Sequence, residues 1–262
     1  MNEQMRASTT TLSGWGWPLL MALIRLPLVL AGSAAAVLAY QWSGNPVGIA
    51  AGLGWSTLTL TVVNLLCLLL LSWRSRLEGF DWREAVGFRW GSLGRDLLWG
   101  LLWSLLLGGL LLLGIFSTVF LFYGLDGFAN LEQFFTGGAD FSFQLPVWLA
   151  LVSAVAFPLL NPFVEELQYR GYAQPGLIAA FRSIPTGILI TALGFGLQHI
   201  VFAVTLPSAL AFVLGFFLWG LGAGLIAHRQ GRLFPLMVAH FISNLSFGVI
   251  PLIIIFSQGV SR

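Results

Sequence analysis

Residues 97–123 read LLWGLLWSLLLGGLLLLGIFSTVFLFY, and this run of 27 residues without a charged side chain decides the fold. A helix that crosses the roughly 30 Å of bilayer hydrocarbon needs about 20 mostly apolar residues, so the run is long enough to span a membrane. The whole chain has the same character, because 58% of its 262 residues are hydrophobic and 8% are charged. A soluble domain carries roughly 25% charged residues. The composition therefore excludes a water-soluble monomer and indicates an integral membrane protein.

Six other stretches are long and apolar enough to be membrane spans. They are residues 18–41, 47–73, 145–170, 184–203, 206–227 and 233–256. The short segments of alternating apolar and polar residues that build a membrane β-barrel are absent from the sequence. We therefore expect an all-α fold, a polytopic membrane helical bundle of about seven transmembrane helices, within a range of about six to eight.

Two features make the number of spans approximate. Arg25 and Pro27 interrupt the first stretch, and a re-entrant or interfacial helix could lie within residues 173–182. We expect residues 1–144 to hold the N-terminal transmembrane helices and an inner-surface segment. Residues 145–256 would hold the core helices, with both parts in one integrated domain.

The positions of the arginines predict the topology. All 12 basic residues are arginine; five of them lie within residues 74–96, and none lies within 124–144, which carries three acidic residues. Loops on the cytoplasmic side carry an excess of Lys and Arg, so we expect residues 74–96 and the N-terminus to be cytoplasmic. The lysine-free composition favours a GC-rich bacterium as the source, so we expect a protein of the bacterial inner membrane or an equivalent membrane. The formal charge of +2 is too small to predict binding to nucleic acid.

Residues 80–90 mix charged side chains with Phe80, Trp82, Phe88 and Trp90. This mixture is typical of a segment that lies on the membrane surface, although an ordinary solvated loop has a similar composition.

Three clusters of polar residues lie inside the predicted spans, where an ionisable group is costly and indicates a function or a paired partner. They are Glu165-Glu166-Leu-Gln-Tyr-Arg170, Phe195-Gly-Leu-Gln-His199 and His240-Phe-Ile-Ser-Asn244. Adjacent residues on a helix point about 100° apart, so the two glutamates must have different surroundings. Arg170 follows Glu166 by four residues, which predicts an ion pair. Glu165 then faces another way and suits a general base, although both glutamates could equally form a structural lock with Arg170.

The other two clusters each place two side chains on one helix face. Phe195 and His199 are one turn apart, as are His240 and Asn244. Two donors that converge from His240 and Asn244 could stabilise a developing oxyanion. The alternative for each histidine is a hydrogen bond that only joins neighbouring helices.

Together the clusters resemble the motifs of the CAAX protease and bacteriocin-processing family (CPBP or ABI), which are intramembrane endopeptidases of the type II CAAX prenyl endopeptidase kind. That family carries Glu-Glu-x-x-x-Arg, Phe-x-x-x-His and His-x-x-x-Asn, in this order on separate helices. All three match without substitution, and the resemblance covers about residues 145–250.

The resemblance implies hydrolysis of a peptide bond within or beside the membrane. It implies that Glu165 activates water with help from His199, and that His240 and Asn244 form the oxyanion site. Glu166 with Arg170 would support the first of these helices, and Phe195 would support the second. The substrate would be a peptide or a membrane protein in the lipid bilayer.

Other readings of the same residues remain open. The family has also been described as metalloproteases, and a glutamate with two histidines could bind zinc. We favour a reaction without cofactor or metal, because Asn244 is a better donor than metal ligand. A non-proteolytic member could act as a scaffold, assembly or immunity factor in a stable complex with another membrane protein. A transporter could use Glu165 as a proton or cation site.

The predicted span boundaries leave the histidines at unequal depths. At 1.5 Å per residue, Glu165 lies only about 7 Å from Arg170, whereas His199 lies about 25 Å from Arg182 if the helix is straight. The two side chains can meet only if the fifth span starts well below the bilayer surface or residues 173–182 dip into the membrane.

Overall fold

A computed structural model describes residues 14–42, 44, 53–138 and 147–248. These residues form helices and turns without a strand, which confirms the all-α prediction. The longer helices are α2 (Gly16–Leu23), α3 (Arg25–Trp42), α5 (Ser56–Glu78), α7 (Leu93–Tyr123), α11 (Phe157–Glu165), α12 (Gln174–Phe181), α13 (Ile184–Gln198), α14 (Leu206–Gln230) and α15 (Phe234–Gly248). Shorter elements are α6 (Trp82–Val86), η1 (Trp90–Ser92), α8 (Asp126–Ala129), α9 (Leu131–Thr136), α10 (Val147–Leu151), η2 (Val152–Ala156), η3 (Glu166–Ala173) and η4 (His199–Phe202).

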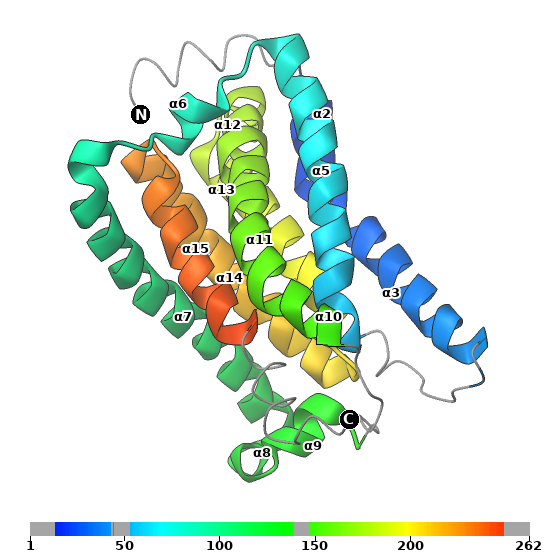
Figure 1. Cartoon of the computed structure of the whole chain (residues 1–262). Coiled ribbons are helices and arrows are strands. Elements are labelled where there is room, and N and C mark those ends of the chain that lie inside the picture. Colours follow the sequence, from blue (N-terminus) through cyan, green and yellow to red (C-terminus); the bar gives the residue numbers. More distant parts are fainter. Residues whose placement is uncertain (1–13, 43, 45–52, 139–146, 249–262) are drawn as a thin grey trace.

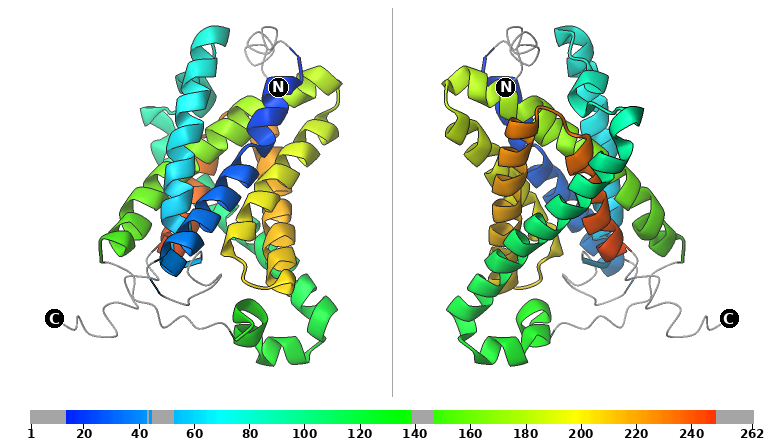
Figure 2. Two further views of the ribbon diagram at one scale, coloured as in Figure 1. Left: turned by 90° about the vertical axis from the view of Figure 1, so that its right-hand side faces the viewer. Right: turned by 90° about the vertical axis from the view of Figure 1, so that its left-hand side faces the viewer.

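Five helical segments among the described residues are long and apolar enough to cross a membrane. They are Gly16–Trp42, Ser56–Glu78, Trp82–Tyr123, Ile184–Phe202 and Leu206–Gln230. The helices pack as the bundle shown in Figure 1 and, from two other sides, in Figure 2. The prediction of a helical membrane protein is therefore confirmed, and the total of about seven spans stays a prediction.

Two predicted boundaries in the N-terminal half differ from the structure. The first span is broken at Ile24, between α2 and α3. Pro27 has no N–H to donate to the carbonyl of Leu23, which explains a break in the helix at this position. The second helix, α5, continues to Glu78, so Arg74 lies within the helix and not in a loop. Residues 47–52 of the predicted span lie outside the described residues.

The fourth predicted span does not end at residue 170. Helical turns run on from Val147 through η2, α11 and the π-helix η3 into α12, and the chain reverses at Arg182, where φ is 51°. The helix expected within residues 173–182 is therefore α12, which continues the helical turns of α11 and η3. Glu165 precedes Arg182 by 17 residues and His199 follows Arg182 by 17, so the two residues are equally far along the chain from the turn of the hairpin. Gln198, the residue before His199, reaches Glu165 across the hairpin with a hydrogen bond of 3.1 Å.

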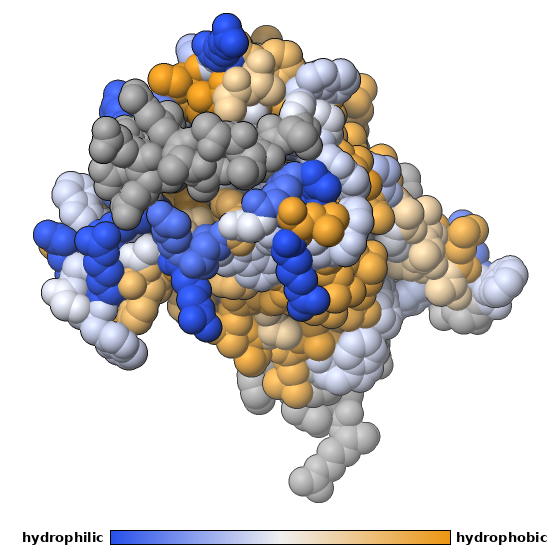
Figure 3. All heavy atoms as spheres, turned by 90° about the horizontal axis from the view of Figure 1, so that it is seen from above, coloured by the Kyte–Doolittle hydropathy of each residue, from blue (hydrophilic) through white to orange (hydrophobic). Residues whose placement is uncertain are grey.

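The connections that carry arginine lie at one end of the bundle. The end of α5, the helix α6 and the turns α12–α13 and α14–α15 lie at the top of Figure 1, whereas α8 and α9 lie at the bottom. Viewed from above, this end shows hydrophilic side chains among apolar ones (Figure 3). Arg232 donates from Nη1 to Asp96 Oδ2 at 2.7 Å, and Leu233 N donates to Ala85 O at 3.1 Å. These contacts join the α14–α15 turn to α6 and α7, and the orientation in the membrane stays a prediction.

Glycines allow the closest approaches between helices. A Cβ on Gly220 would lie 3.0 Å from the Cα of Ala192, so α14 contacts α13 backbone to backbone at this point. A Cβ on Gly194 of α13 would meet the backbone carbonyl of Ala22 in α2. Gly109 of α7, by contrast, has nothing within 4 Å of such a Cβ. Small residues at helix crossings are the usual means of close packing in membranes.

We expect Gly194→Ala to destabilise the protein by about 1–3 kcal/mol, because the added methyl group forces α2 away from α13. The matched control is Gly109→Ala, which adds the same methyl group in open space and should stabilise α7 by about 0.5–1 kcal/mol. Thermal unfolding of both variants in detergent measures the difference. Equal stability of the two variants would contradict the close approach of α2 and α13.

Candidate functional site

A buried ion pair joins the N-terminal part of the chain to the first motif. Arg25 at the start of α3 donates from Nη2 to Glu165 Oε1 at 2.7 Å. The two side chains are 0% and 1% exposed. A charge in such surroundings is tolerated only when it is paired and hydrogen-bonded, so each of these residues depends on the other.

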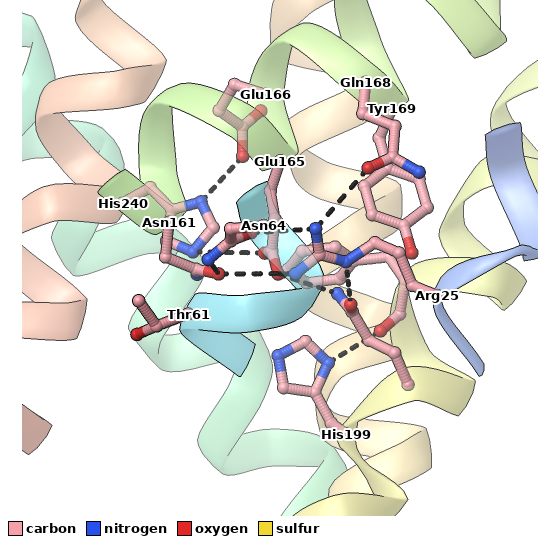
Figure 4. Close-up of polar contacts among 12 residues, drawn as sticks. Arg25, Thr61, Asn64, Asn161, Glu165, Glu166, Gln168, Tyr169, His199 and His240 are labelled. Carbon is pink, nitrogen blue, oxygen red and sulfur yellow. Dashed lines mark hydrogen bonds and ion pairs between the residues drawn. The ribbon is translucent and has the colours of Figure 1, made fainter. Parts of the chain in front are cut away.

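Four amide side chains complete the surroundings of the Arg25 guanidinium (Figure 4). Its Nη1 donates to Asn64 Oδ1 at 2.8 Å and to Gln168 Oε1 at 3.4 Å, and its Nη2 donates to Asn161 Oδ1 at 3.4 Å. Its Nε donates to Gln198 Oε1. These acceptors come from α5, η3, α11 and α13, so one guanidinium holds four other helical elements together.

The amides are also bonded to one another and to Glu165. Gln198 Nε2 donates to Glu165 Oε1 at 3.1 Å, and Asn64 Nδ2 donates to Asn161 Oδ1 at 2.8 Å. Gln168 Nε2 donates to Met21 O at 2.7 Å. The result is a connected polar network in which Glu165 Oε1 has two donors.

Glu166 faces a different set of partners from Glu165. Arg170 Nη1 lies 3.3 Å from Glu166 Oε1, so the ion pair expected from their spacing is present. His240 Nδ1 lies 2.8 Å from the same oxygen, and a carboxylate can only accept, so Nδ1 is the donor. The other ring nitrogen, Nε2, lies 3.6 Å from Glu165 Oε2. His240 therefore stands between the two carboxylates (Figure 4).

Phe195 and His199 are held by aromatic packing. Phe195 stacks on Trp219 with ring centroids 4.9 Å apart, and the guanidinium of Arg170 lies 4.4 Å from the Phe195 centroid. His199 Nδ1 lies 2.6 Å from the carbonyl oxygen of Phe195, and its ring stacks on Phe216 at 3.4 Å. Because a carbonyl only accepts, Nδ1 carries the proton and Nε2 keeps its lone pair.

His199 and Asn244 are not joined to the network of Arg25 and Glu165 by a hydrogen bond among the described residues. Among the described residues, no hydrogen bond or ion pair joins His199 to Glu165. Asn244 lies one turn after His240 on α15 and is 8% exposed, and its Nδ2 is buried without a hydrogen-bond partner. Glu165 Oε2 is also buried and has no hydrogen-bond partner. Buried polar atoms without partners are costly, so each of them can bind a water molecule or a ligand group, and Glu166 Oε2 is a further atom of this kind in the site.

Sequence reasoning missed Arg25 and its amide partners. It assigned Glu165 no partner of opposite charge apart from Arg170, whereas Arg25 supplies a positive charge at 2.7 Å. The signal was present, because Arg25 is a charged residue inside a predicted span and such a residue indicates a partner. Its partner could not be named from the sequence, since Arg25 and Glu165 are 140 residues apart.

The residues near Glu165 do not form a prepared metal site. Within the described parts of the chain, no group of three or more His, Cys, Asp or Glu side chains is arranged to hold a metal ion. At Glu165 Oε1 a guanidinium already occupies the place of a cation. That the reaction uses a glutamate and not a zinc ion stays a prediction.

Comparison with known families gives one match to this part of the chain. Residues 146–246 match the family model described as type II CAAX prenyl endopeptidase Rce1-like. This region is therefore similar to the CAAX protease family, in agreement with the family indicated by the three motifs. The match supports a membrane protease that acts on a peptide in a membrane setting. No curated protein and no solved structure matches the chain.

We expect Gln198→Leu to destabilise the protein by about 1–3 kcal/mol, because Arg25 Nε would lose its acceptor and Glu165 Oε1 would lose a donor. Gln230→Leu is the control, since Gln230 lies at the end of α14 and its Oε1 has no hydrogen-bond partner. Chemical or thermal unfolding in detergent compares the two. A Gln198 variant as stable as the Gln230 variant would show that the network contributes nothing measurable.

Proposed function

We propose that the chain is a membrane-embedded endopeptidase in which Glu165 activates the attacking water. The observation that carries this proposal is the environment of Glu165 Oε2. This oxygen is buried without a hydrogen-bond partner and lies 3.6 Å from His240 Nε2. A carboxylate oxygen in this condition is available to accept a proton from water.

The proposed reaction uses the other motif residues as follows. As the water oxygen bonds to the carbonyl carbon of the substrate, Glu165 Oε2 takes one water proton. The negative charge that develops on the carbonyl oxygen would be stabilised by Asn244 Nδ2 and by His240 Nε2 when that ring carries its second proton. Collapse of the tetrahedral intermediate breaks the C–N bond, and the proton held by Glu165 passes to the leaving nitrogen.

His199 would assist by orienting the water. Its Nδ1 is committed to the Phe195 carbonyl, so Nε2 is the ring atom that can accept a hydrogen bond. Stacking on Phe216 fixes the plane of the ring and therefore the direction of that lone pair. Glu166 would hold His240 through Nδ1, and Arg170 would hold Glu166 in place through their ion pair.

The first test removes the base and its assistant. We expect Glu165→Gln and His199→Ala to abolish cleavage while the protein still folds, because each variant removes an acceptor for water. The assay reconstitutes purified protein in liposomes with a quenched-fluorescent peptide library and identifies the cut bonds by mass spectrometry. Glu84→Gln, on the exposed side of α6, is the matched control. Normal cleavage by both site variants would overturn the proposal.

A second test concerns the catalytic type. We expect cleavage to persist after prolonged chelation, and added zinc not to increase it, because the proposed step needs only Glu165 and water. Metal analysis of the active, purified protein is the accompanying measurement. Loss of activity on chelation with recovery on zinc addition would establish the metalloprotease alternative.

One observation favours a second candidate function, a non-proteolytic scaffold or assembly factor for another membrane protein. The Arg25–Glu165 pair joins helices from both halves of the chain, as a purely structural lock would. In that case Glu165→Gln would keep the biological effect, and a stoichiometric partner would co-purify from native membranes. A cleaved substrate would support the endopeptidase.

A further inference from the structure

Arg25 has a position that stability alone does not explain. It is fully buried, belongs to α3 and lies outside the matched region, residues 146–246. Buried ion pairs are weak stabilisers, because the cost of removing both charges from water offsets their attraction. Apolar side chains of similar volume often stabilise a protein as well or better. The pair therefore calls for a role in addition to holding the fold.

The four charges of the site form two separate pairs. Arg170 forms an ion pair with Glu166, and Arg25 forms an ion pair with Glu165. With two carboxylates and two guanidinium groups the cluster is balanced in charge. Without Arg25, two neighbouring buried carboxylates would share a single guanidinium, which is unfavourable for two like charges in a medium of low dielectric constant.

The contacts of Arg25 also orient the carboxylate. Glu165 Oε1 accepts from Arg25 Nη2 at 2.7 Å and from Gln198 Nε2 at 3.1 Å. With both donors on Oε1, the second oxygen, Oε2, is turned to the side of His240. The guanidinium is fixed in turn, because its three nitrogens donate to side chains on separate helices. A planar fork of five donors suits this arrangement, and a lysine ammonium cannot reproduce it.

We propose that Arg25 is a positioning residue of the proteolytic site, which holds the Glu165 side chain with Oε2 directed at the water. The inference rests on the proposed function, since it assigns Arg25 a part in the same reaction. The break at Ile24 fits this role, because helix α3 starts at Arg25, whose guanidinium contacts Glu165.

The decisive variants are Arg25→Lys and Arg25→Gln, measured with the best substrate of the peptide library. We expect kcat to fall about 100-fold in Arg25→Gln and about 10-fold in Arg25→Lys, with KM changed less than about threefold, because a misplaced base slows the chemical step and not the binding of substrate. Partial recovery by lysine would reflect retained charge without the fork. Arg232→Gln, which removes an ion pair with Asp96 at the end of the bundle, should keep wild-type kcat.

Stability separates positioning from unfolding. We expect Arg25→Gln to lower the unfolding temperature, and Arg25→Gln with Glu165→Gln to raise it again, because the double variant leaves no unpaired buried charge. Arg25→Lys keeps the charge and carries the kinetic test if Arg25→Gln does not fold. Wild-type kcat in a folded Arg25→Lys would overturn this inference while leaving the proposed function intact. Normal cleavage by Glu165→Gln would overturn both.

Discussion

The structure depends on the need to keep a buried guanidinium satisfied. Arg25 has no access to water, so each of its donors must find an acceptor within the protein. The acceptors come from four other helical elements, α5, α11, η3 and α13. Moving any of these elements would leave a charge or an amide without a partner. The packing of small residues between helices supplies contact, whereas this network selects one arrangement among many of similar contact.

The helical hairpin of residues 147–198 brings the charged residues to the network. Adjacent residues on a helix point about 100° apart, which lets Glu165 and Glu166 face different partners. Glu165 faces Arg25 and Gln198, and Glu166 faces Arg170 and His240. Glu165 and His199 are each 17 residues from Arg182, and Gln198 contacts Glu165 across the hairpin. The hairpin and the different directions of the two glutamates together explain why residues far apart in the chain share one site.

Much of the fold could be predicted from hydropathy, because a membrane-spanning helix requires a long run of apolar residues. The Glu166–Arg170 pair could also be predicted, since residues four apart lie on one helix face. The continuation of the fourth span past residue 170 could not. Arg170 marks a helix end only if its charge must reach water, and here Glu166 and aromatic rings neutralise and cover it. The partner of Arg25 could not be predicted either, because a contact between residues 140 positions apart follows from the tertiary structure alone.

The contacts of Arg25 and Gln198 give the two oxygens of Glu165 different surroundings. The proposed reaction needs a fixed side chain and also an oxygen that can take a proton from water and release it to the leaving nitrogen. The contacts divide these two requirements between the two oxygens of the carboxylate. Oε1 carries the ion pair, and Oε2, without a hydrogen-bond partner and 3.6 Å from His240 Nε2, is left for the proton. The proposed catalytic site would thus depend on an arginine from a helix that lies outside the matched residues 146–246.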